Sequence, residues 1–259
     1  MTNWAALLTA IAALLKAIAW PIVIVVVLVC YRSRISSLIV VFAKKLGTAT
    51  KFKAGQFELE VTEQQVKQVL DETVKTARDD IQQKIPEEQL RAAEEVERLL
   101  QESQLSAALV VVSRQMESLI SEYEDIRRRM PQEPMRIGRM NEVAAKMRAL
   151  GLAARPLFRS FQSGQLAGER LAAICILQVA PDFGYFHWLI QRIKTEEQPF
   201  IFFQAAVAVL EVVKAHMYAD KNAVTSAIED ARQHIANFQG GIPDQSTIDL
   251  LDMALMQVV

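Results

Sequence analysis

A basic segment in the middle of the chain holds the residues best suited to chemistry or binding. Residues 127–159 contain nine Lys and Arg residues against two acidic ones. Arginine presents a planar fork of N–H donors that matches phosphate and carboxylate oxygens. The segment therefore predicts a site for an anion, such as a lipid headgroup, a nucleotide or a nucleic acid. We expect this site to be formed by Arg127, Arg128, Arg129, Arg136, Arg139 and Arg148.

These arginines also have a simpler explanation. Carboxylates lie just before them in the sequence, and side chains one helical turn apart pair readily. Ion pairing within the chain is therefore the interpretation that the sequence favours. Nucleic acid is the least expected ligand, because too few aromatic side chains are interleaved with the cations to stack on bases. The carboxylates are Glu117, Glu122, Glu124 and Asp125.

The other reactive residue types show no pattern typical of catalysis or metal binding. The three histidines are His187, His216 and His234, and none has the spacing of a known metal motif. Cys30 and Cys175 are far apart, and no CxxC, nucleophile elbow or phosphate-binding glycine loop occurs. From the sequence we therefore expect no catalytic residue, no metal and no cofactor.

The first 31 residues predict a membrane anchor. From residue 4 to residue 31 an apolar run is interrupted only by Thr9, Lys16 and Pro21, and about 20 apolar residues cross the hydrocarbon core as a helix. Only Met-Thr-Asn precedes the run, whereas six cations follow it by residue 53. The positive-inside rule then puts a short N-terminus outside and the rest of the chain in the cytoplasm. We expect the membrane to be a bacterial inner membrane.

Small residues recur at every fourth position of this anchor, at Ala5, Thr9, Ala13 and Ala17. Such a ridge lets two membrane helices approach closely, so self-association through it is a hypothesis. The alternative is that alanine is simply a common helix former. The expected partners are thus the lipid bilayer, with anionic headgroups near the cations, a protein of unknown identity, and a second copy of the chain.

Residues 32–61 form a basic juxtamembrane segment with the one β signal in the sequence. Apolar and polar residues alternate on both sides of Ala54-Gly55, which predicts a short β-hairpin or a single strand. After this segment the apolar period changes to that of amphipathic helices. We therefore expect a helical stalk or bundle over residues 62–130.

The stalk has two apolar faces that can be assigned from the sequence. After Pro86 we expect a helix whose inward face holds Leu90, Ala93, Val96 and Leu100. The next helix has a heptad seam, which suits either an internal bundle face or a dimeric coiled coil. The seam is made of Leu109, Val112, Met116, Leu119, Tyr123, Ile126 and Met130.

Residues 131–259 predict a second helical domain, separated from the stalk by Pro131 and Pro134. Its segment AAICIL at 172–177 matches AAVAVL at 205–210. Over about residues 168–218 this pattern resembles HEAT-type helical repeats, in which stacked helix pairs share a core. The order of anchor, basic segment, short strand and long helices also resembles that of uncharacterised bacterial single-pass membrane proteins. The predicted fold class is mainly α.

The resemblance to helical repeats implies a surface that binds proteins or peptides rather than a catalytic centre. The leading hypothesis is a single-pass membrane-anchored interaction or signalling scaffold without enzymatic activity. One alternative is a membrane-perturbing effector, for example in a bacterial defence system, whose helical domain senses a ligand or partner. A further alternative is a hydrolase with an unfamiliar arrangement of active-site residues.

Overall fold

The computed structural model is mainly helical. The residues it describes lie in one compact unit, Glu58–Val259, and contain no strand. The prediction of a mainly α chain is confirmed for these residues. The predicted anchor, its small-residue ridge and the predicted β element lie outside them. The described ranges are 63–74, 85–101, 105–131, 134–216, 220–238 and 244–258.

None of the helices in these ranges combines the length and the apolar character that crossing a bilayer requires.

Prolines set the starts of several helices. A helix over residues 63–74 comes first, followed by α3 (Glu87–Gln101), α4 (Leu105–Arg129), α5 (Pro134–Leu150), η1 (Arg155–Leu157) and α6 (Phe158–Gln162). The later elements are α7 (Ala167–Val179), η2 (Phe183–Tyr185), α8 (Phe186–Thr195), α9 (Pro199–Ala215), α10 (Lys221–Ala236) and α11 (Gln245–Val258). Proline is tolerated at a helix start, because the first N–H groups have no intrahelical acceptor.

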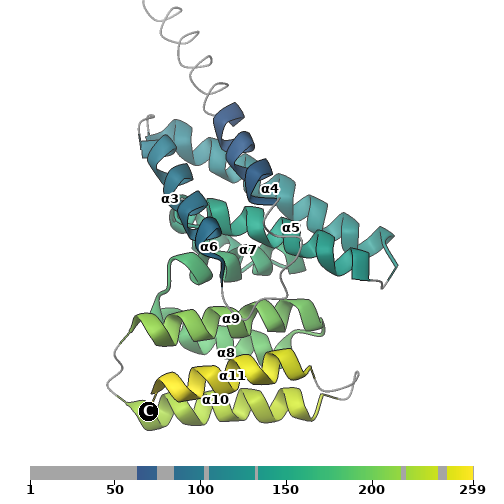
Figure 1. Ribbon diagram of the computed structural model, residues 1–259, viewed down its shortest axis with the longest axis vertical. Coiled ribbons are helices and arrows are strands. Elements are labelled where there is room, and N and C mark those ends of the chain that lie inside the picture. Colours follow the sequence, from purple (N-terminus) through teal and green to yellow (C-terminus); the bar gives the residue numbers. More distant parts are fainter. Residues whose placement is uncertain are drawn as a thin grey trace, which may run out of the picture. The chain divides into compact units, whose positions relative to one another are not determined.

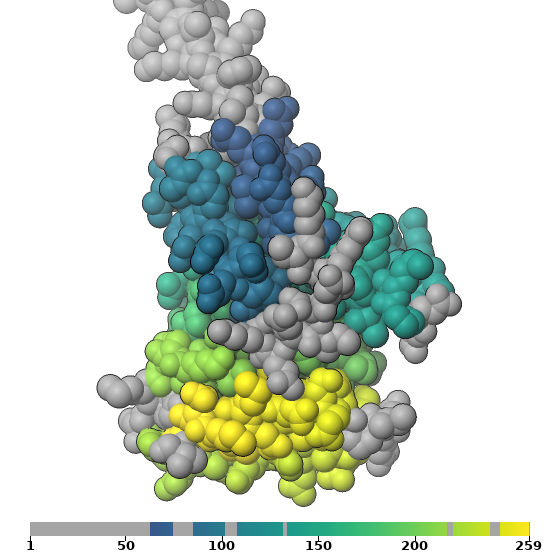
Figure 2. All heavy atoms as spheres, in the orientation of Figure 1, coloured from purple at the N-terminus to yellow at the C-terminus, as the bar shows by residue number. Residues whose placement is uncertain are grey.

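The helices share one core. α5 packs against α3, α4 and α7, and α9 packs against α7, α8 and α11 (Figure 1). At the C-terminal end of the chain, α10 and α11 lie side by side on the surface (Figure 2). The hydrophobic cluster inside runs from Val66 to Val258. Residues on both sides of the predicted boundary near residue 131 therefore pack into the same core.

The heptad seam of α4 is part of this core. Its middle residues, from Val112 to Ile126, are buried, whereas Leu109 and Met130 at its ends are half-buried. α4 contacts α5 and α7 of the same chain. These contacts favour the internal bundle face over the dimeric coiled coil as the role of the seam.

The two similar segments lie in α7 and α9, which pack directly against each other. Every residue of 172–177 and 205–210 is buried. A helix that is apolar on all sides is typical of such central positions, and the alanines let neighbouring helices approach closely. The shared pattern thus reflects complete burial of both segments, and the resemblance to HEAT-type repeats stays a prediction.

One residue predicted to face inward in α3 does not. The other three predicted positions are buried, but Leu90 is 37% exposed and Gln89 beside it is 1% exposed. The reason is a hydrogen bond inside the core, in which Nε of Arg148 donates to Oε1 of Gln89 at 2.6 Å. At this one position the hydrogen bond to Arg148 therefore places Gln89, and not Leu90, on the buried face of α3.

Gly151 lies at a close contact between the end of α5 and the end of α7. A Cβ at this position would collide with Cγ2 of Val179 and would lie 2.9 Å from the carbonyl oxygen of Arg148. We expect Gly151→Ala to lower the free energy of unfolding by about 2 kcal/mol, because overpacking forces backbone to move. Urea unfolding of the full chain measures the change.

Gly138 provides the matched control for this substitution. It lies within α5, and a Cβ there would have nothing within 4 Å. Gly138→Ala should leave stability unchanged or raise it by up to about 1 kcal/mol, since alanine favours the helix. Equal losses in the two variants would show that close packing at Gly151 is not the cause.

Candidate anion-binding site

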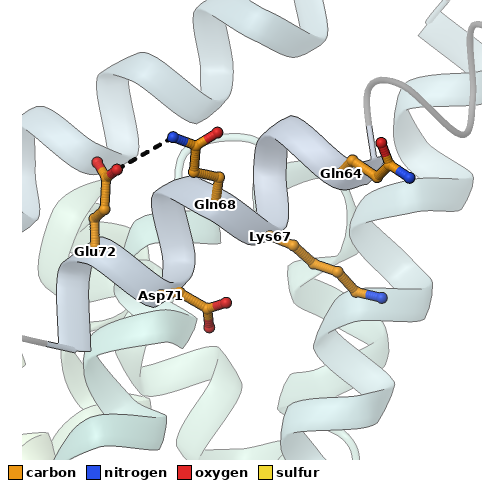
Figure 3. A pocket seen from close by; sticks show the side chains of 5 residues that line it. All are labelled: Gln64, Lys67, Gln68, Asp71 and Glu72. Carbon is orange, nitrogen blue, oxygen red and sulfur yellow. Dashed lines mark hydrogen bonds between the residues drawn. The ribbon is translucent and has the colours of Figure 1, made fainter.

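A hollow on the first described helix is one candidate site (Figure 3). Its side chains come from a single face of this helix, and Nε2 of Gln68 donates to Oε1 of Glu72 at 3.3 Å. The hollow is open to solvent, and all of the residues that line it are exposed. The hollow therefore resembles an ordinary exposed helix surface, and we do not consider it further as a binding site. The lining residues are Gln64, Lys67, Gln68, Asp71 and Glu72.

A stronger candidate lies where α4, α5, α7 and α8 bring charged side chains to one buried tyrosine. Tyr123 of α4 has no exposed surface, and nearby charges from α4, α5 and the end of α8 act on its hydroxyl. Arg170 of α7 and Arg192 of α8 join this group through a shared carboxylate. We call it the arginine–tyrosine cluster: Tyr123, Glu124, Arg127, Arg136, Arg170, Arg192 and Glu196.

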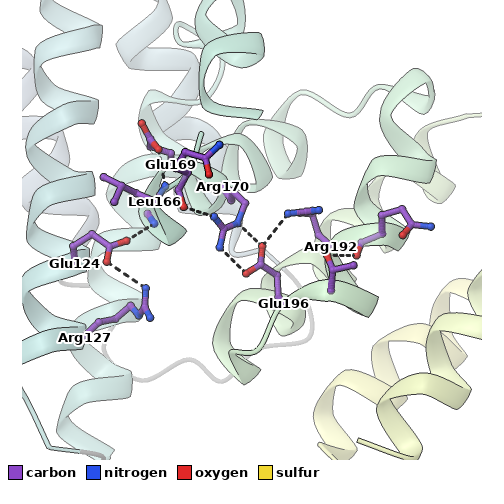
Figure 4. Close-up of polar contacts among 11 residues, drawn as sticks. Glu124, Arg127, Leu166, Glu169, Arg170, Arg192 and Glu196 are labelled. Carbon is purple, nitrogen blue, oxygen red and sulfur yellow. Dashed lines mark hydrogen bonds and ion pairs between the residues drawn. The ribbon is translucent and has the colours of Figure 1, made fainter. Parts of the chain in front are cut away.

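Glu196 is the shared carboxylate (Figure 4). Its side chain is 4% exposed, and it accepts hydrogen bonds from Nε and Nη2 of Arg170 at 2.5 and 3.0 Å. Nη1 of Arg192 donates to it at 3.4 Å. The two-pronged contact with Arg170 is a strong and directional form of ion pair. It therefore ties the start of α7 to the end of α8.

Glu124 connects α4 to α7. Its carboxylate accepts the N–H of Gly168 at 2.8 Å and a hydrogen bond from Nη1 of Arg127 at 3.2 Å. Gly168 lies in the first turn of α7, where N–H groups lack helical acceptors and attract negative charge. A Cβ on residue 168 would lie 3.1 Å from the carbonyl oxygen of Ile120. Glycine therefore permits the approach that brings Glu124 to the start of α7.

Several donors in the cluster remain without an acceptor. Buried side-chain nitrogen and oxygen atoms that lack a hydrogen bond in the described residues number four, and all four belong to this cluster. Leaving one such group unpaired costs about 1–3 kcal/mol, so folded proteins rarely do it. The atoms are the hydroxyl of Tyr123 and Nε of Arg127, Arg136 and Arg192.

Positive charge is also in excess in the cluster. Its four arginines face two carboxylates, and one of these, Glu196, is shared by Arg170 and Arg192. Within the described part of the chain, Arg136 forms no ion pair at all. Unused donors together with uncompensated cations are the features that an anion-binding site requires.

The tyrosine is a neutral donor in this setting. Burial raises the pKa of Tyr123 above its ordinary value, and this effect exceeds the opposing one of the nearby Arg127 cation. The hydroxyl is therefore protonated at physiological pH. The guanidinium of Arg127 lies 5.8 Å from the centre of the ring, a typical cation–π distance, and the ring of Phe200 lies 6.0 Å away.

We expect Tyr123→Phe to raise the free energy of unfolding by about 1 kcal/mol, because it removes a buried hydroxyl that has no acceptor. The ring and its contact with Phe200 remain. Thermal or urea unfolding of the full chain measures the change, with Tyr185→Phe as a second tyrosine that packs against an aromatic ring, Phe158, at 4.3 Å. A loss of stability specific to Tyr123→Phe would mean that the hydroxyl has a partner in solution.

Part of this cluster could be predicted from the sequence. The structure brings together Arg127 and Arg136 from the predicted anion site, and it adds Arg170 and Arg192, which lie outside the basic segment. Arg192 and Glu196 are four residues apart, a spacing that weakly predicts an ion pair on a helix. No local pattern marks Arg170, because its partner Glu196 is 26 residues away.

Three other arginines of the predicted site form ion pairs within their own helices. Arg128 and Arg129 are exposed and lie 3.3 and 3.6 Å from the carboxylate of Asp125. Arg139 of α5 lies 2.9 Å from the carboxylate of Glu142. For Arg128 and Arg129 the structure agrees with pairing to the carboxylates just before the basic segment. The partner of Arg139 is instead Glu142 of its own helix.

Arg148 lies apart from the others, in the core. Besides its bond to Gln89, its Nη1 donates to Oε1 of Gln178 at 3.0 Å and to Oε1 of Gln204 at 3.1 Å. Burial lowers the pKa of the Arg148 guanidinium, and these three hydrogen-bond partners are neutral. The side chain therefore links α5 to α3, α7 and α9 rather than contributing to the arginine–tyrosine cluster.

Outside this cluster, the described residues show neither a candidate metal site nor a reactive thiol. They contain no group of three or more His, Cys, Asp and Glu residues that could hold a metal ion. Cys175 is buried, and burial raises the pKa of its thiol to about 12, so the nucleophilic thiolate is scarce at neutral pH. In comparisons with known proteins, no family model, no curated protein and no solved structure matches the chain.

Proposed function

We propose that this chain is a membrane-tethered helical interaction module, without enzymatic activity, that binds an anionic group at the arginine–tyrosine cluster. The observation that carries the proposal is that all four buried side-chain polar atoms without a hydrogen bond in the described residues belong to this one cluster. A set of donors that destabilises the free protein is expected where a ligand supplies the missing acceptors.

The helices around the cluster support binding by holding its side chains in place. The ion pair between Arg170 and Glu196 joins α7 to the end of α8, and the bond between Glu124 and Gly168 joins α4 to α7. Beneath them, Leu119 and Ile126 of α4 and Leu171 of α7 are buried in the core. Because the backbone around the cluster is fixed, the conformational entropy lost on binding is limited to that of the side chains.

The membrane tether rests on the apolar run at residues 4–31 and the cations that follow it. We propose that it holds the helical body at the cytoplasmic face of a bacterial inner membrane. There the cluster would meet both cytosolic anions and anionic headgroups. The buried repeat-like helices α7 and α9 would form the frame of a surface for a protein partner.

Fractionation of cells that express the full chain tests the tether. We expect the chain in the membrane pellet, released by neutral detergent but not by high salt, because an apolar span holds it there rather than ion pairs. Recovery of the intact chain in the detergent-free supernatant would contradict the tether. It would not bear on the anion site, which has its own test.

Calorimetric titration of the full chain in neutral detergent tests the anion site, with inorganic phosphate and sulfate as probes at fixed ionic strength. We expect Arg136→Gln to weaken binding by about tenfold or more, since one charge-assisted hydrogen bond contributes about 1.5–3 kcal/mol. Arg155→Gln is the control, because Arg155 is exposed and belongs to η1 rather than to the cluster. Equal affinity in the wild type and both variants, or no binding at all, would contradict the proposal.

A further inference from the structure

We propose that the arginine–tyrosine cluster is selective for a phosphate monoester in its doubly charged form. This inference rests on the proposed anion site and adds the class of ligand. It is carried by the uncompensated charge of the cluster and by the origin of its unused donors on three different helices.

The charge of the cluster matches a dianion. Arg127 has the carboxylate of Glu124, and Arg170 has most of the hydrogen bonds to Glu196. Arg136 has no carboxylate within the described residues, and Arg192 has only a long contact of 3.4 Å with Glu196. Two cations are thus poorly compensated. A phosphate monoester carries a charge of about −1.5 to −2 at neutral pH, whereas a diester carries one negative charge.

The unused donors belong to several helices, which suits a ligand with more than two acceptor oxygens. They come from three helices: the hydroxyl of Tyr123 and Nε of Arg127 from α4, Nε of Arg136 from α5, and Nε of Arg192 from α8. A monoester has three terminal oxygens that accept from several directions at once, whereas a carboxylate accepts in one plane. The start of α7 is not part of the proposed site, because Glu124 already accepts from Gly168.

A ligand reaches these donors from the solvent side of the cluster. The side chains of Arg127 and Arg192 are 24% and 25% exposed, so part of each faces solvent although its Nε atom is buried. Tyr123 is fully buried and lies on the inner side of the cluster. We infer that the arginine side chains rotate to turn Nε toward the bound oxygens, and that the neutral tyrosine hydroxyl donates to one of them.

The test compares phenyl phosphate, a monoester, with diphenyl phosphate, a diester, by calorimetric titration of the full chain in neutral detergent. At pH 7.5 and fixed ionic strength we expect the monoester to bind at least about tenfold more tightly, since the second charge forms further charge-assisted bonds. Tyr123→Phe and Arg136→Gln should each weaken monoester binding by about tenfold, whereas Arg128→Gln, outside the cluster, should not. Thermal unfolding confirms that each variant is folded.

The outcomes separate this inference from the proposed function. If the diester binds as tightly as the monoester and Arg136→Gln weakens both, the anion site stands and the preference for a dianion is overturned. If neither ligand binds in a way that depends on Arg136, the anion site itself is overturned. An unchanged monoester affinity in Tyr123→Phe would remove the tyrosine from the site.

A second comparison identifies the source of the monoester. The full chain is placed in lipid nanodiscs that contain either phosphatidic acid, whose headgroup is a monoester, or phosphatidylglycerol, whose headgroup is a diester. If a lipid is the natural ligand, phosphatidic acid alone will compete with phenyl phosphate and lower its apparent affinity by about tenfold or more. Equal phenyl phosphate affinity in the two nanodiscs would support a soluble monoester instead.

Discussion

Arg148→Ala should lower the free energy of unfolding by about 4 kcal/mol, the largest effect that we expect from a single substitution. Gln89, Gln178 and Gln204 all accept hydrogen bonds from this guanidinium, and each is at most 4% exposed. The substitution leaves Oε1 of Gln89 and of Gln178 without this donor, whereas Oε1 of Gln204 keeps the bond from Nε2 of Gln178. Breaking a buried polar network in this way typically costs about 3–5 kcal/mol. Urea unfolding of the full chain measures the loss.

Two comparisons separate the network from the mere truncation of a side chain. Arg159→Ala removes an exposed arginine and should change stability by no more than about 0.5 kcal/mol. Replacing Arg148 by Met and the three glutamines by Leu should recover most of the loss, because a well-packed apolar set often substitutes for a buried charged one. If Arg148→Ala stays within about 1 kcal/mol of the wild type, water or another group satisfies the glutamines and the network does not stabilise the fold.

Glu196→Ala should lower the free energy of unfolding by about 3 kcal/mol. It removes the carboxylate that accepts from Arg170 and Arg192 and leaves two cations in a largely buried position. The expected loss is smaller than for Arg148, because both arginines keep some contact with water. Glu197→Ala is the matched control, since this neighbouring glutamate is exposed and should matter by less than about 0.5 kcal/mol.

The same substitution should strengthen binding of phosphate monoesters while it weakens the fold. Without Glu196, the uncompensated positive charge of the arginine–tyrosine cluster rises by one, so we expect about tenfold tighter binding in the titration with phenyl phosphate. This opposite movement of stability and affinity distinguishes a binding site from a purely structural ion pair. A variant that loses stability without any gain in affinity would indicate that Glu196 only joins α7 to α8.

Tyr123 is expected to show the reverse relation. Tyr123→Phe should stabilise the protein and weaken binding, because the hydroxyl has no acceptor in the described structure until a ligand supplies one. Residues kept for binding often reduce stability in this way. Glu196→Ala should thus make the fold less stable and binding tighter, whereas Tyr123→Phe should make the fold more stable and binding weaker.

Much of the helical architecture could be predicted from the sequence, because it depends on local properties. The apolar spacing of α4 predicts its buried face from Val112 to Ile126. Pro86, Pro134 and Pro199 stand immediately before a helix or at its first residue, since proline restricts the backbone of its own and the preceding residue. The anchor over residues 1–31 and the β element that follows are likewise predictions from local pattern.

Only the tertiary structure decided which polar residues meet. Arg148 bonds to glutamines 59, 30 and 56 residues away, and Arg170 pairs with Glu196 from another helix. A run of like charges shows that arginines are close in sequence, but helix packing determines which of them face a carboxylate, a glutamine or an unsatisfied tyrosine. For this reason six arginines of one basic segment separate into surface pairs, a core network and part of the candidate anion site. Helical period and chain breaks are encoded within a few residues, whereas a binding site depends on contacts that form only when distant helices share a core.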